Sequence, residues 1–291
     1  MKKILITGAN SYIGTSFETY CHENYNGEYA IDTVDMVDGS WRKKDFSKYD
    51  TVFHVAGIAH SDTKKVSDER KAFYYKINAD LTKETAKKAK AEGVSQFVFM
   101  SSIVVYGDSA PIGKSKVITK DTPVAPANFY GDSKVQAENG IKGLESDGFK
   151  VVILRPPMIY GKDSKGNYPT LTKLACKLPI FPYVKNERSM LYIENLCEFI
   201  KLMIENAENG TFYPQNAEYS NTSELVKMIG KRHGKNVKLV KGFAWLLKMM
   251  GKLTDVVTKA FGNLCYAKSL SEYKTDYRKY AVKESIDRTE R

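Results

Sequence analysis

The sequence predicts an α/β fold, in which a doubly wound parallel sheet precedes a smaller, mostly helical C-terminal lobe. Short apolar runs alternate with longer helix-like patterns as far as residue 155, a turn with two glycines follows the first run, and the pattern changes after residue 155. Alternating strands and helices form βαβ units, whose right-handed crossovers place helices on both faces of a parallel sheet. Ligands of such sheets bind at the carboxyl ends of the strands.

Each predicted element follows from its apolar spacing. Short apolar runs predict buried strands at residues 3–7, 30–35, 51–55, 97–101 and 151–154. Helical spacing predicts helices at residues 12–23, 68–91 and 130–146, and then at 170–177, 194–208, 223–233 and 242–261. Two further strands are predicted near residues 210–213 and 237–240. We expect a sheet domain over residues 1–160, to which later strands also contribute, and a closely packed, partly interleaved second lobe over residues 161–291.

Composition limits the class of protein. The chain has 291 residues, of which 42% are hydrophobic and 27% charged, as in an ordinary globular protein. Four separated cysteines without a CxxC pair argue against a disulfide scaffold and a cysteine-built zinc site. The first apolar run is too short for a signal peptide, and no run of about 18 apolar residues occurs. These features predict a soluble, cytoplasmic protein.

The net charge of +11 suits a phosphorylated small ligand. The lysines are scattered instead of forming one tract with interleaved aromatic residues, so we expect no nucleic-acid partner. The predicted helix 242–261 carries an apolar stripe among lysines. Packing inside the second lobe is the favoured interpretation of that stripe, and contact with a membrane surface stays open.

The turn after the first strand predicts a dinucleotide site of the Rossmann type. Gly8 permits a tight turn, Gly14 lets the following helix approach the sheet, and the helix N-terminus can bind a pyrophosphate. Ser11 stands where a second glycine is usual. Asp35 ends the second strand and favours NAD over NADP, with Asp32 as a competitor for that role. The basic run at residues 42–44 leaves NADP open.

A serine, a tyrosine and a lysine form the candidate catalytic group. Tyr130 and Lys134 are four residues apart on one helical face, and Ser101 and Ser102 end the fourth strand at the carboxyl edge. A free phenol has a pKa of about 10 and is a poor base at neutral pH. A neighbouring ammonium and an oxidised nicotinamide favour the phenolate, which could then act as a base.

Six stretches in order carry a family resemblance: TGANSYIG, FHVAGIAH, FVFMSSIVVYG, YGDSK, RPPMIYG and NERSMLYIENL. Together they resemble the extended branch of the short-chain dehydrogenase/reductase superfamily, the NAD-dependent epimerase/dehydratase group acting on nucleotide sugars. The resemblance implies catalytic roles for Ser102, Tyr130 and Lys134. It implies cofactor contacts, beyond Tyr130 and Lys134, for Gly8, Ser11, Tyr12, Ile13, Gly14, Asp35, Asp45, Phe46, Ala56, Gly57, Asn78 and Pro157.

Substrate contacts are implied for His60, Ser102, Asn167 and Arg188, and no metal site is indicated. Arg188 aligns with an arginine that binds the sugar-nucleotide diphosphate in the family. The resemblance implies NAD-dependent oxidoreduction at C4 of a UDP-hexose, as in a UDP-glucose or UDP-N-acetylhexosamine 4-epimerase. Two alternatives are an NAD(P)H-dependent 4-ketoreductase of a UDP-4-keto-6-deoxy-hexose and a non-catalytic dinucleotide sensor. A third, a 4,6-dehydratase, is disfavoured because Ile103 and Val104 follow Ser102. A homodimer through residues 68–91 and 130–146 is implied by the family alone.

Overall fold

The computed structural model describes residues 1–58, 66–243, 247 and 255–291, and the chain divides into two compact units. The first unit consists of Met1–Gly107, Val124–Pro156 and Leu196–Tyr213, and the second of Asp108–Pro123, Pro157–Asn195 and Pro214–Arg291. The chain therefore crosses between the units several times. His60 lies outside the described residues, as does half of the helix predicted at 242–261.

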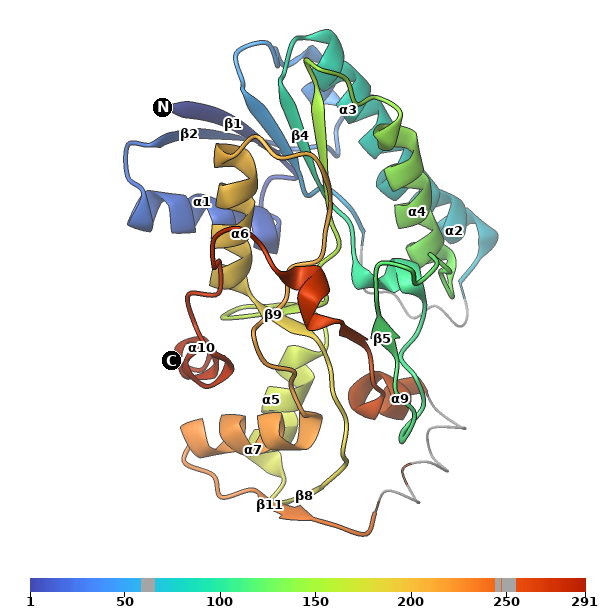
Figure 1. Ribbon diagram of the computed structural model, residues 1–291, viewed down its shortest axis with the longest axis vertical. Helices are drawn as coiled ribbons and strands as arrows, with labels where there is room; N and C mark the ends of the chain where they lie inside the picture. Colours follow the sequence, from blue (N-terminus) through green and yellow to red (C-terminus); the bar gives the residue numbers. More distant parts are fainter. Residues whose placement is uncertain (59–65, 244–246, 248–254) are drawn as a thin grey trace. The chain divides into compact units, whose positions relative to one another are not determined.

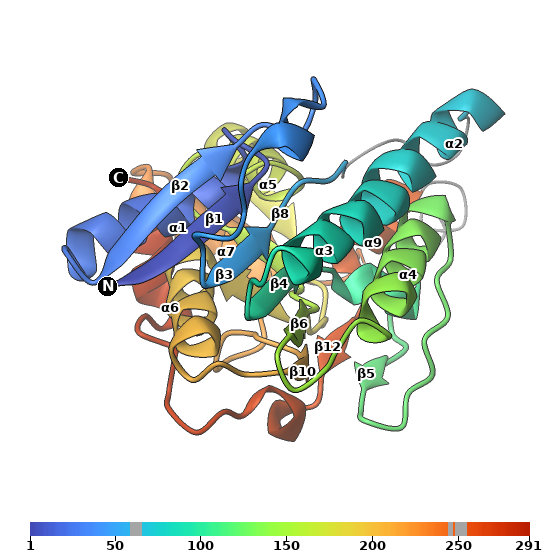
Figure 2. The ribbon, with the colours of Figure 1, turned by 90° about the horizontal axis from the view of Figure 1, so that it is seen from above.

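The first unit is built on one parallel sheet of six strands (Figure 1), in the order β10-β6-β4-β3-β1-β2, all of which are labelled in Figure 2. Its strands are β1 (Lys2–Thr7), β2 (Tyr29–Val34), β3 (Thr51–His54), β4 (Gln96–Met100), β6 (Lys150–Leu154) and β10 (Gly210–Phe212). All five predicted N-terminal strands are present, and the strand predicted near 210–213 pairs with β6. The doubly wound α/β fold is confirmed.

Helices cover both faces of this sheet (Figure 2). They are α1 (Tyr12–Asn24) and α6 (Ile193–Glu205) on one face, and α2 (Asp68–Tyr75), α3 (Leu81–Ala91) and α4 (Phe129–Lys142) on the other. Three short helical turns complete the unit: η1 (Ser40–Lys43), the π-helical turn η2 (Lys76–Asp80) and η3 (Ile103–Tyr106). The predicted helix 68–91 is thus α2, η2 and α3 in succession, because a π-turn interrupts the regular α-helical hydrogen bonding.

Alternate strand residues fill the two halves of the core. Val52 and Phe97 pack with Ala86 and Ala137 from α3 and α4 in one fully buried cluster. On the opposite face, Phe53 meets Phe17 of α1 edge to face at 5.4 Å between ring centres. Burial on both faces explains why the central strands read as continuous apolar runs.

The strand order reverses beside β1, which pairs with β2 on one side and β3 on the other. From β2 the chain passes to β3, and then to β4 and β6 in the opposite direction across the sheet. The carboxyl ends of β1 and β3 therefore border the switch point, where sheets of this kind bind their ligands.

The second unit contains helices and three two-stranded parallel sheets. The pairs are β5 (Val117–Ile118) with β12 (Cys265–Tyr266), β7 (Met158–Tyr160) with β9 (Met190–Tyr192), and β8 (Ile180–Pro182) with β11 (Lys238–Val240). The helices are α5 (Tyr168–Lys177), α7 (Thr222–Arg232), α9 (Asp255–Phe261), the short η4 (Lys268–Ser271) and α10 (Val282–Thr289). Within the described residues, no helix has the length and apolar character that crossing a membrane requires.

Candidate active site

The turns after β1 and β3 contact each other directly. Gly8 has a φ of +96°, a conformation that residues with a side chain rarely adopt. A Cβ on Gly8 would lie 2.9 Å from the backbone nitrogen of Ala56, which follows β3. Gly8 and Ala56, both predicted cofactor residues, are therefore in contact at the switch point, where a side chain on Gly8 would not fit.

Ser11 is the N-cap of α1, which explains a serine where glycine is usual. Its hydroxyl accepts a hydrogen bond from the Gly14 amide at 3.2 Å. A Cβ on Gly14 would lie 2.6 Å from that hydroxyl and 3.0 Å from Cγ2 of Ile6. Tyr12 and Ile13 open the helix, whose N-terminus carries the N–H groups and dipole that suit a pyrophosphate. The turn fits the dinucleotide that the sequence predicts.

Two aspartates at β2 have different surroundings. Asp32 accepts a hydrogen bond from the Tyr49 hydroxyl and lies 3.8 Å from the Lys48 ammonium. The Tyr49 bond, with smaller help from nearby lysines, lowers the pKa of Asp32. Asp35 comes directly after β2, is exposed, and accepts a hydrogen bond from the Val37 amide at 2.8 Å. Asp35 thus stands at the carboxyl edge, where an adenosine ribose binds in this fold.

The neighbouring loop contains the other adenosine-side candidates. Arg42 forms a two-pronged ion pair with Glu84 of α3, at 2.5 and 2.6 Å, so this cation already has a partner. Asp45 is exposed and accepts hydrogen bonds from the amide and hydroxyl of Ser47. Phe46 is fully buried in the core. Of the two predicted adenine contacts, Asp45 and Phe46, only Asp45 has an exposed side chain.

Tyr130 lies in the first turn of α4, beside Ser102. Asn128 caps the helix by accepting hydrogen bonds from the amides of Tyr130 and Gly131, each at 3.1 Å. Ser102 comes two residues after β4 and caps η3 by accepting from the Val104 amide at 3.3 Å. Burial raises the pKa of Tyr130 to about 12, and the hydrogen bond with Ser102 acts in the opposite direction.

Lys134 is buried one helical turn after Tyr130. Its ammonium donates a hydrogen bond to the Met100 carbonyl at 2.9 Å and lies 4.8 Å from the centre of the Phe99 ring. Burial lowers the pKa of Lys134 to about 8, and the charge of Glu138 opposes that shift. A Cβ on Gly57 would lie 3.3 Å from the Lys134 ammonium, so this amine lies beside the turn after β3.

The electrostatics of Tyr130 differ from the sequence expectation at one point. We expected the neighbouring ammonium to lower the pKa of the phenol, whereas burial dominates and raises it. The Tyr74 ring, whose centre is 6.4 Å away, forms part of the apolar surroundings. The lowering of this pKa remains a prediction for the cofactor-bound enzyme, in which an oxidised nicotinamide would add positive charge.

Asn78 connects the turn after β3 to the catalytic helix. It lies in the π-turn η2, a local distortion that is frequent at functional sites. Its amide oxygen accepts from the Ile58 amide at 2.8 Å, and its amide nitrogen donates to the Ile58 carbonyl and to the Ser133 hydroxyl. The Ser133 hydroxyl donates to the Tyr130 carbonyl at 2.8 Å. Asn78 therefore fixes the backbone around Tyr130.

Sequence reasoning missed a buried ion pair next to the catalytic residues. Arg155 and Glu138 form two hydrogen bonds, at 3.0 and 2.5 Å, with side chains only 5% and 1% exposed. Ser101 donates to the same carboxylate at 2.5 Å. Because Ser101 precedes Ser102 and Glu138 follows Lys134 by one turn, the pair supports both. The spacing of Glu138 from Lys134 was the available signal.

Sequence reasoning also missed His54, although this residue lies in the FHVAGIAH stretch that contributes to the family resemblance. It is fully buried, with Nδ1 2.6 Å from the Thr7 hydroxyl and Nε2 3.0 Å from the Thr82 hydroxyl. Thr82 donates its proton to the Asn78 carbonyl, so it accepts from Nε2–H of a neutral imidazole. Burial, with a smaller contribution from Lys134, lowers the pKa of His54 to about 3. This imidazole therefore stays neutral at physiological pH.

The remaining candidates lie in the second unit. Pro157 is buried at the start of a segment of that unit, and Asn167 is exposed and precedes α5 without capping it through its side chain. The Arg188 guanidinium donates to the Gly262 carbonyl at 3.1 Å, and no carboxylate in the described part of the chain pairs with it. Burial lowers the pKa of Arg188. An unpaired, largely buried guanidinium suits a phosphate group.

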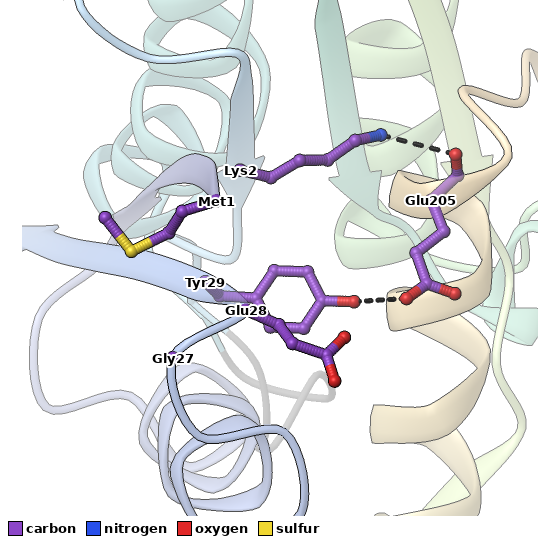
Figure 3. A pocket seen from close by; sticks show the side chains of 6 residues that line it. All are labelled: Met1, Lys2, Gly27, Glu28, Tyr29 and Glu205. Atoms are coloured by element: carbon purple, nitrogen blue, oxygen red, sulfur yellow. Dashed lines mark hydrogen bonds between the residues drawn. The ribbon is translucent and has the colours of Figure 1, made fainter.

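A pocket of about 450 Å³ in the first unit lies apart from these residues (Figure 3). It opens at the amino ends of β1 and β2, opposite the glycine turn, and is lined by Met1, Lys2, Gly27, Glu28, Tyr29 and Glu205. Lys2 donates to backbone carbonyls at the end of α6, and Tyr29 donates to the Glu205 carboxylate at 2.5 Å. These polar groups are satisfied within the protein. Among the described residues, no cluster of histidine, cysteine and acidic side chains could hold a metal ion.

The fold and the site define an NAD-dependent enzyme of the short-chain dehydrogenase/reductase type. The chain belongs to the NAD-dependent epimerase/dehydratase family, whose sequence model matches residues 4–214. Both the family resemblance and the nicotinamide cofactor class drawn from the sequence are confirmed.

Several known proteins are similar to this chain in sequence or in fold. The chain is 30% identical over 290 residues to a UDP-glucose 4-epimerase from Vibrio cholerae, covering 90% of this chain and 86% of that protein. A dTDP-4-dehydrorhamnose reductase from Clostridium acetobutylicum has a similar fold, with a TM-score of 0.72 at 21% identity over 99% and 98% of the two chains. A UDP-glucuronic acid 4-epimerase from Bacillus cereus, solved with NAD, gives a TM-score of 0.71 at 17% identity over 98% and 96%.

Proposed function

We propose that this enzyme catalyses oxidoreduction at C4 of a UDP-activated hexose, as a UDP-glucose or UDP-N-acetylhexosamine 4-epimerase. The observation that carries the proposal is the hydrogen bond between Ser102 and Tyr130, with Lys134 one helical turn later and beside the turn after β3. Similarity to a UDP-glucose 4-epimerase over most of both chains supports the choice of substrate.

The chain's own residues would bind the cofactor along the carboxyl edge. Gly8, Ser11 and Gly14 would receive the pyrophosphate at the N-terminus of α1, and Asp35 the adenosine ribose. Lys134 would bind the nicotinamide ribose. When bound, NAD would supply the acceptor for the hydride that leaves C4 of the sugar and, in its reduced form, the donor that returns this hydride to the opposite face.

Proton transfer falls to the side chains of the first unit. Tyr130, as phenolate, takes the proton of the sugar C4 hydroxyl, and Ser102 donates a hydrogen bond to the same oxygen. Lys134 stabilises the negative phenolate through its positive charge. After the ketone has presented its other face, Tyr130 returns the proton to the oxygen. Because burial raises the pKa of Tyr130 to about 12 without cofactor, the proposal requires this pKa to fall when NAD binds.

Substrate recognition is assigned to a small set of residues. Arg188 would pair with the substrate diphosphate, because its guanidinium lacks a carboxylate partner among the described residues. Asn167 would contact the same region from the start of α5. His60, which lies outside the described residues, is assigned from its position in the sequence after the third predicted strand.

The proposal includes a cytoplasmic homodimer formed through α2, α3 and α4. Phe73 of α2 is 53% exposed, which supports a protein contact on that helix. Sedimentation-velocity measurement of the purified protein tests the dimer, and a monomer at micromolar concentration would contradict it.

A 4-ketoreductase of a UDP-4-keto-6-deoxy-hexose is the second candidate, favoured by the fold similarity to a dTDP-4-dehydrorhamnose reductase. One assay separates the two functions. The purified protein is incubated with UDP-glucose or UDP-N-acetylglucosamine without added cofactor, and the sugars are identified by NMR. Formation of the C4 epimer supports the first candidate. Turnover only with a 4-keto sugar and added NADH or NADPH supports the second.

Tyr130→Phe should reduce turnover by about 10²- to 10⁴-fold, because it removes the group that carries the proton. NAD binding, measured by calorimetry, should stay close to that of the wild type. Tyr75→Phe is the matched control, since Tyr75 of α2 donates to Asp132 of α4 and neither residue belongs to the proposed catalytic or cofactor-binding set. Full activity of Tyr130→Phe would refute the mechanism, and binding of NAD without turnover of any nucleotide sugar would favour a sensor.

A further inference from the structure

β8 and β11 pair as a two-stranded ribbon in the second unit (Figure 1). Neighbours in register point to the same side of a parallel pair. Phe181, paired with Leu239, is only 4% exposed and packs on Phe261 at 5.8 Å between ring centres. Ile180, paired with Lys238, lies on the opposite face, where Ile180 is 55% exposed. The outer face thus combines an aliphatic side chain with a lysine.

Two more exposed apolar side chains lie next to the ribbon in the sequence. Leu178, 38% exposed, precedes β8 by two residues, and Phe243, 46% exposed, follows β11. We call Leu178, Ile180 and Phe243, together with the exposed lysines Lys238 and Lys241, the ribbon patch. It contains three of the eight exposed large hydrophobic side chains in the described part of the chain. Apolar side chains gathered in this way usually mark an interaction site.

The segments that form the ribbon patch carry unusual charge. Residues 164–186 contain four lysines and no acidic residue, and residues 225–243 contain five lysines, one arginine and no acidic residue. These ten basic residues nearly equal the net charge of +11 of the whole chain. None of them forms an ion pair with a carboxylate within the described residues. The net positive charge of the protein is therefore concentrated in the two segments that contain β8 and β11.

An anionic lipid bilayer matches both properties. Aliphatic and aromatic side chains enter the boundary between headgroups and acyl chains, and lysines at the same level attract acidic headgroups. A nucleic acid would use the lysines and leave Leu178 and Ile180 without a partner. We propose that the ribbon patch docks this protein on the surface of an anionic membrane. Docking of this kind goes beyond the proposed catalysis and does not depend on it.

Vesicle co-sedimentation of the full chain tests the proposal. The protein should sediment with vesicles of phosphatidylcholine and phosphatidylglycerol, and much less with phosphatidylcholine alone or at high salt. The double variant Lys238→Glu with Lys241→Glu should weaken partitioning by about fivefold or more for each lysine. Ile180→Ser with Phe243→Ser should also weaken it at unchanged charge. Thermal unfolding of each variant checks that the fold is retained.

Two matched controls separate the ribbon patch from general surface effects. Lys120→Glu removes an exposed lysine elsewhere in the second unit, and Val37→Ser removes the most exposed apolar side chain of the first unit. Both should sediment like the wild type. Equal sedimentation of the ribbon variants and the wild type would overturn the proposal, as would equal loss in the controls. Salt-sensitive binding to duplex DNA without vesicle binding would overturn it in favour of a nucleic acid.

Discussion

Two ion pairs at the carboxyl edge of the sheet in the first unit, one on the adenosine side and one on the catalytic side, differ in their exposure to solvent. On the adenosine side, near β2, Arg42 and Glu84 form an ion pair whose side chains are 51% and 46% exposed. On the catalytic side, near β4 and β6, Arg155 and Glu138 form a pair with 5% and 1% exposed. The geometry is alike, since each arginine contacts both carboxylate oxygens of its partner.

The difference in burial gives these pairs different physical consequences. Water and salt screen an exposed pair, so its contribution to stability is small. A buried pair lies in a medium of low polarity, where loss of one partner leaves an uncompensated charge. Substitutions in the exposed pair on the adenosine side should therefore change the free energy of unfolding little. On the catalytic side, which also contains the buried Lys134, removal of a single charge should destabilise the protein because the remaining charges are buried without compensation.

Glu138→Gln should give the largest effect on stability. The amide cannot balance the charge of Arg155, so we expect a loss of about 3–5 kcal/mol in the free energy of unfolding, measured by urea denaturation. The charge of Glu138 also raises the pKa of Lys134 against burial. A second readout is therefore the pH profile of turnover, whose limb belonging to Lys134 should move to lower pH.

A double variant, Glu138→Leu with Arg155→Met, is the control for the buried pair. Two apolar side chains of similar volume leave no buried charge, so most of the lost stability should return. Turnover should stay low, because Ser101 loses its carboxylate acceptor. A single variant as stable as the wild type would show that the pair is not electrostatically isolated from water.

His54 on β3, between the two sides, should affect stability in a pH-dependent way. Its pKa is about 3 in the folded protein and about 6.5 in an unfolded chain, so only the unfolded state binds this proton between those values. His54 therefore makes the wild type lose stability as the pH falls from about 6.5 toward 3. His54→Gln keeps a donor and an acceptor but does not titrate.

The measurement is the free energy of unfolding of both proteins at several pH values. The difference between wild type and His54→Gln removes the contributions of the carboxylates, which both proteins share. We expect the wild type to lose more stability on acidification. Parallel curves for the two proteins would contradict a neutral, buried imidazole.

The sequence predicted the features of the edge that depend on local pattern. The glycine turn, the buried strands and the spacing of Tyr130 from Lys134 are each encoded within a few residues. The Ser11 cap also depends on local sequence, but only the hydrogen bond from the Gly14 amide explains why serine replaces glycine at this position. These features need no knowledge of distant contacts.

Features that depend on long-range packing could not be predicted in this way. Arg155 and Glu138 meet only because β6 lies against α4. The spacing of Glu138 from Lys134 places the acid on the catalytic side of the helix, but it does not identify Arg155 as the partner. The burial of His54 depends on Thr7 and Thr82, which come from other elements. The π-turn around Asn78 does not change the apolar spacing from which one continuous helix was predicted.

The smallest effect should come from the exposed pair, through Glu84→Gln. We expect no measurable change in urea unfolding, because solvent screens the pair. Releasing Arg42 near the end of β2 adds a cation on the adenosine side, so binding of NADPH should improve a few-fold relative to NADH. Fluorescence titration with the two reduced cofactors measures this ratio. The gain should shrink at high salt, and Arg42→Gln with Glu84→Gln should abolish it. A loss of stability like that of Glu138→Gln would show that exposure does not separate the two pairs.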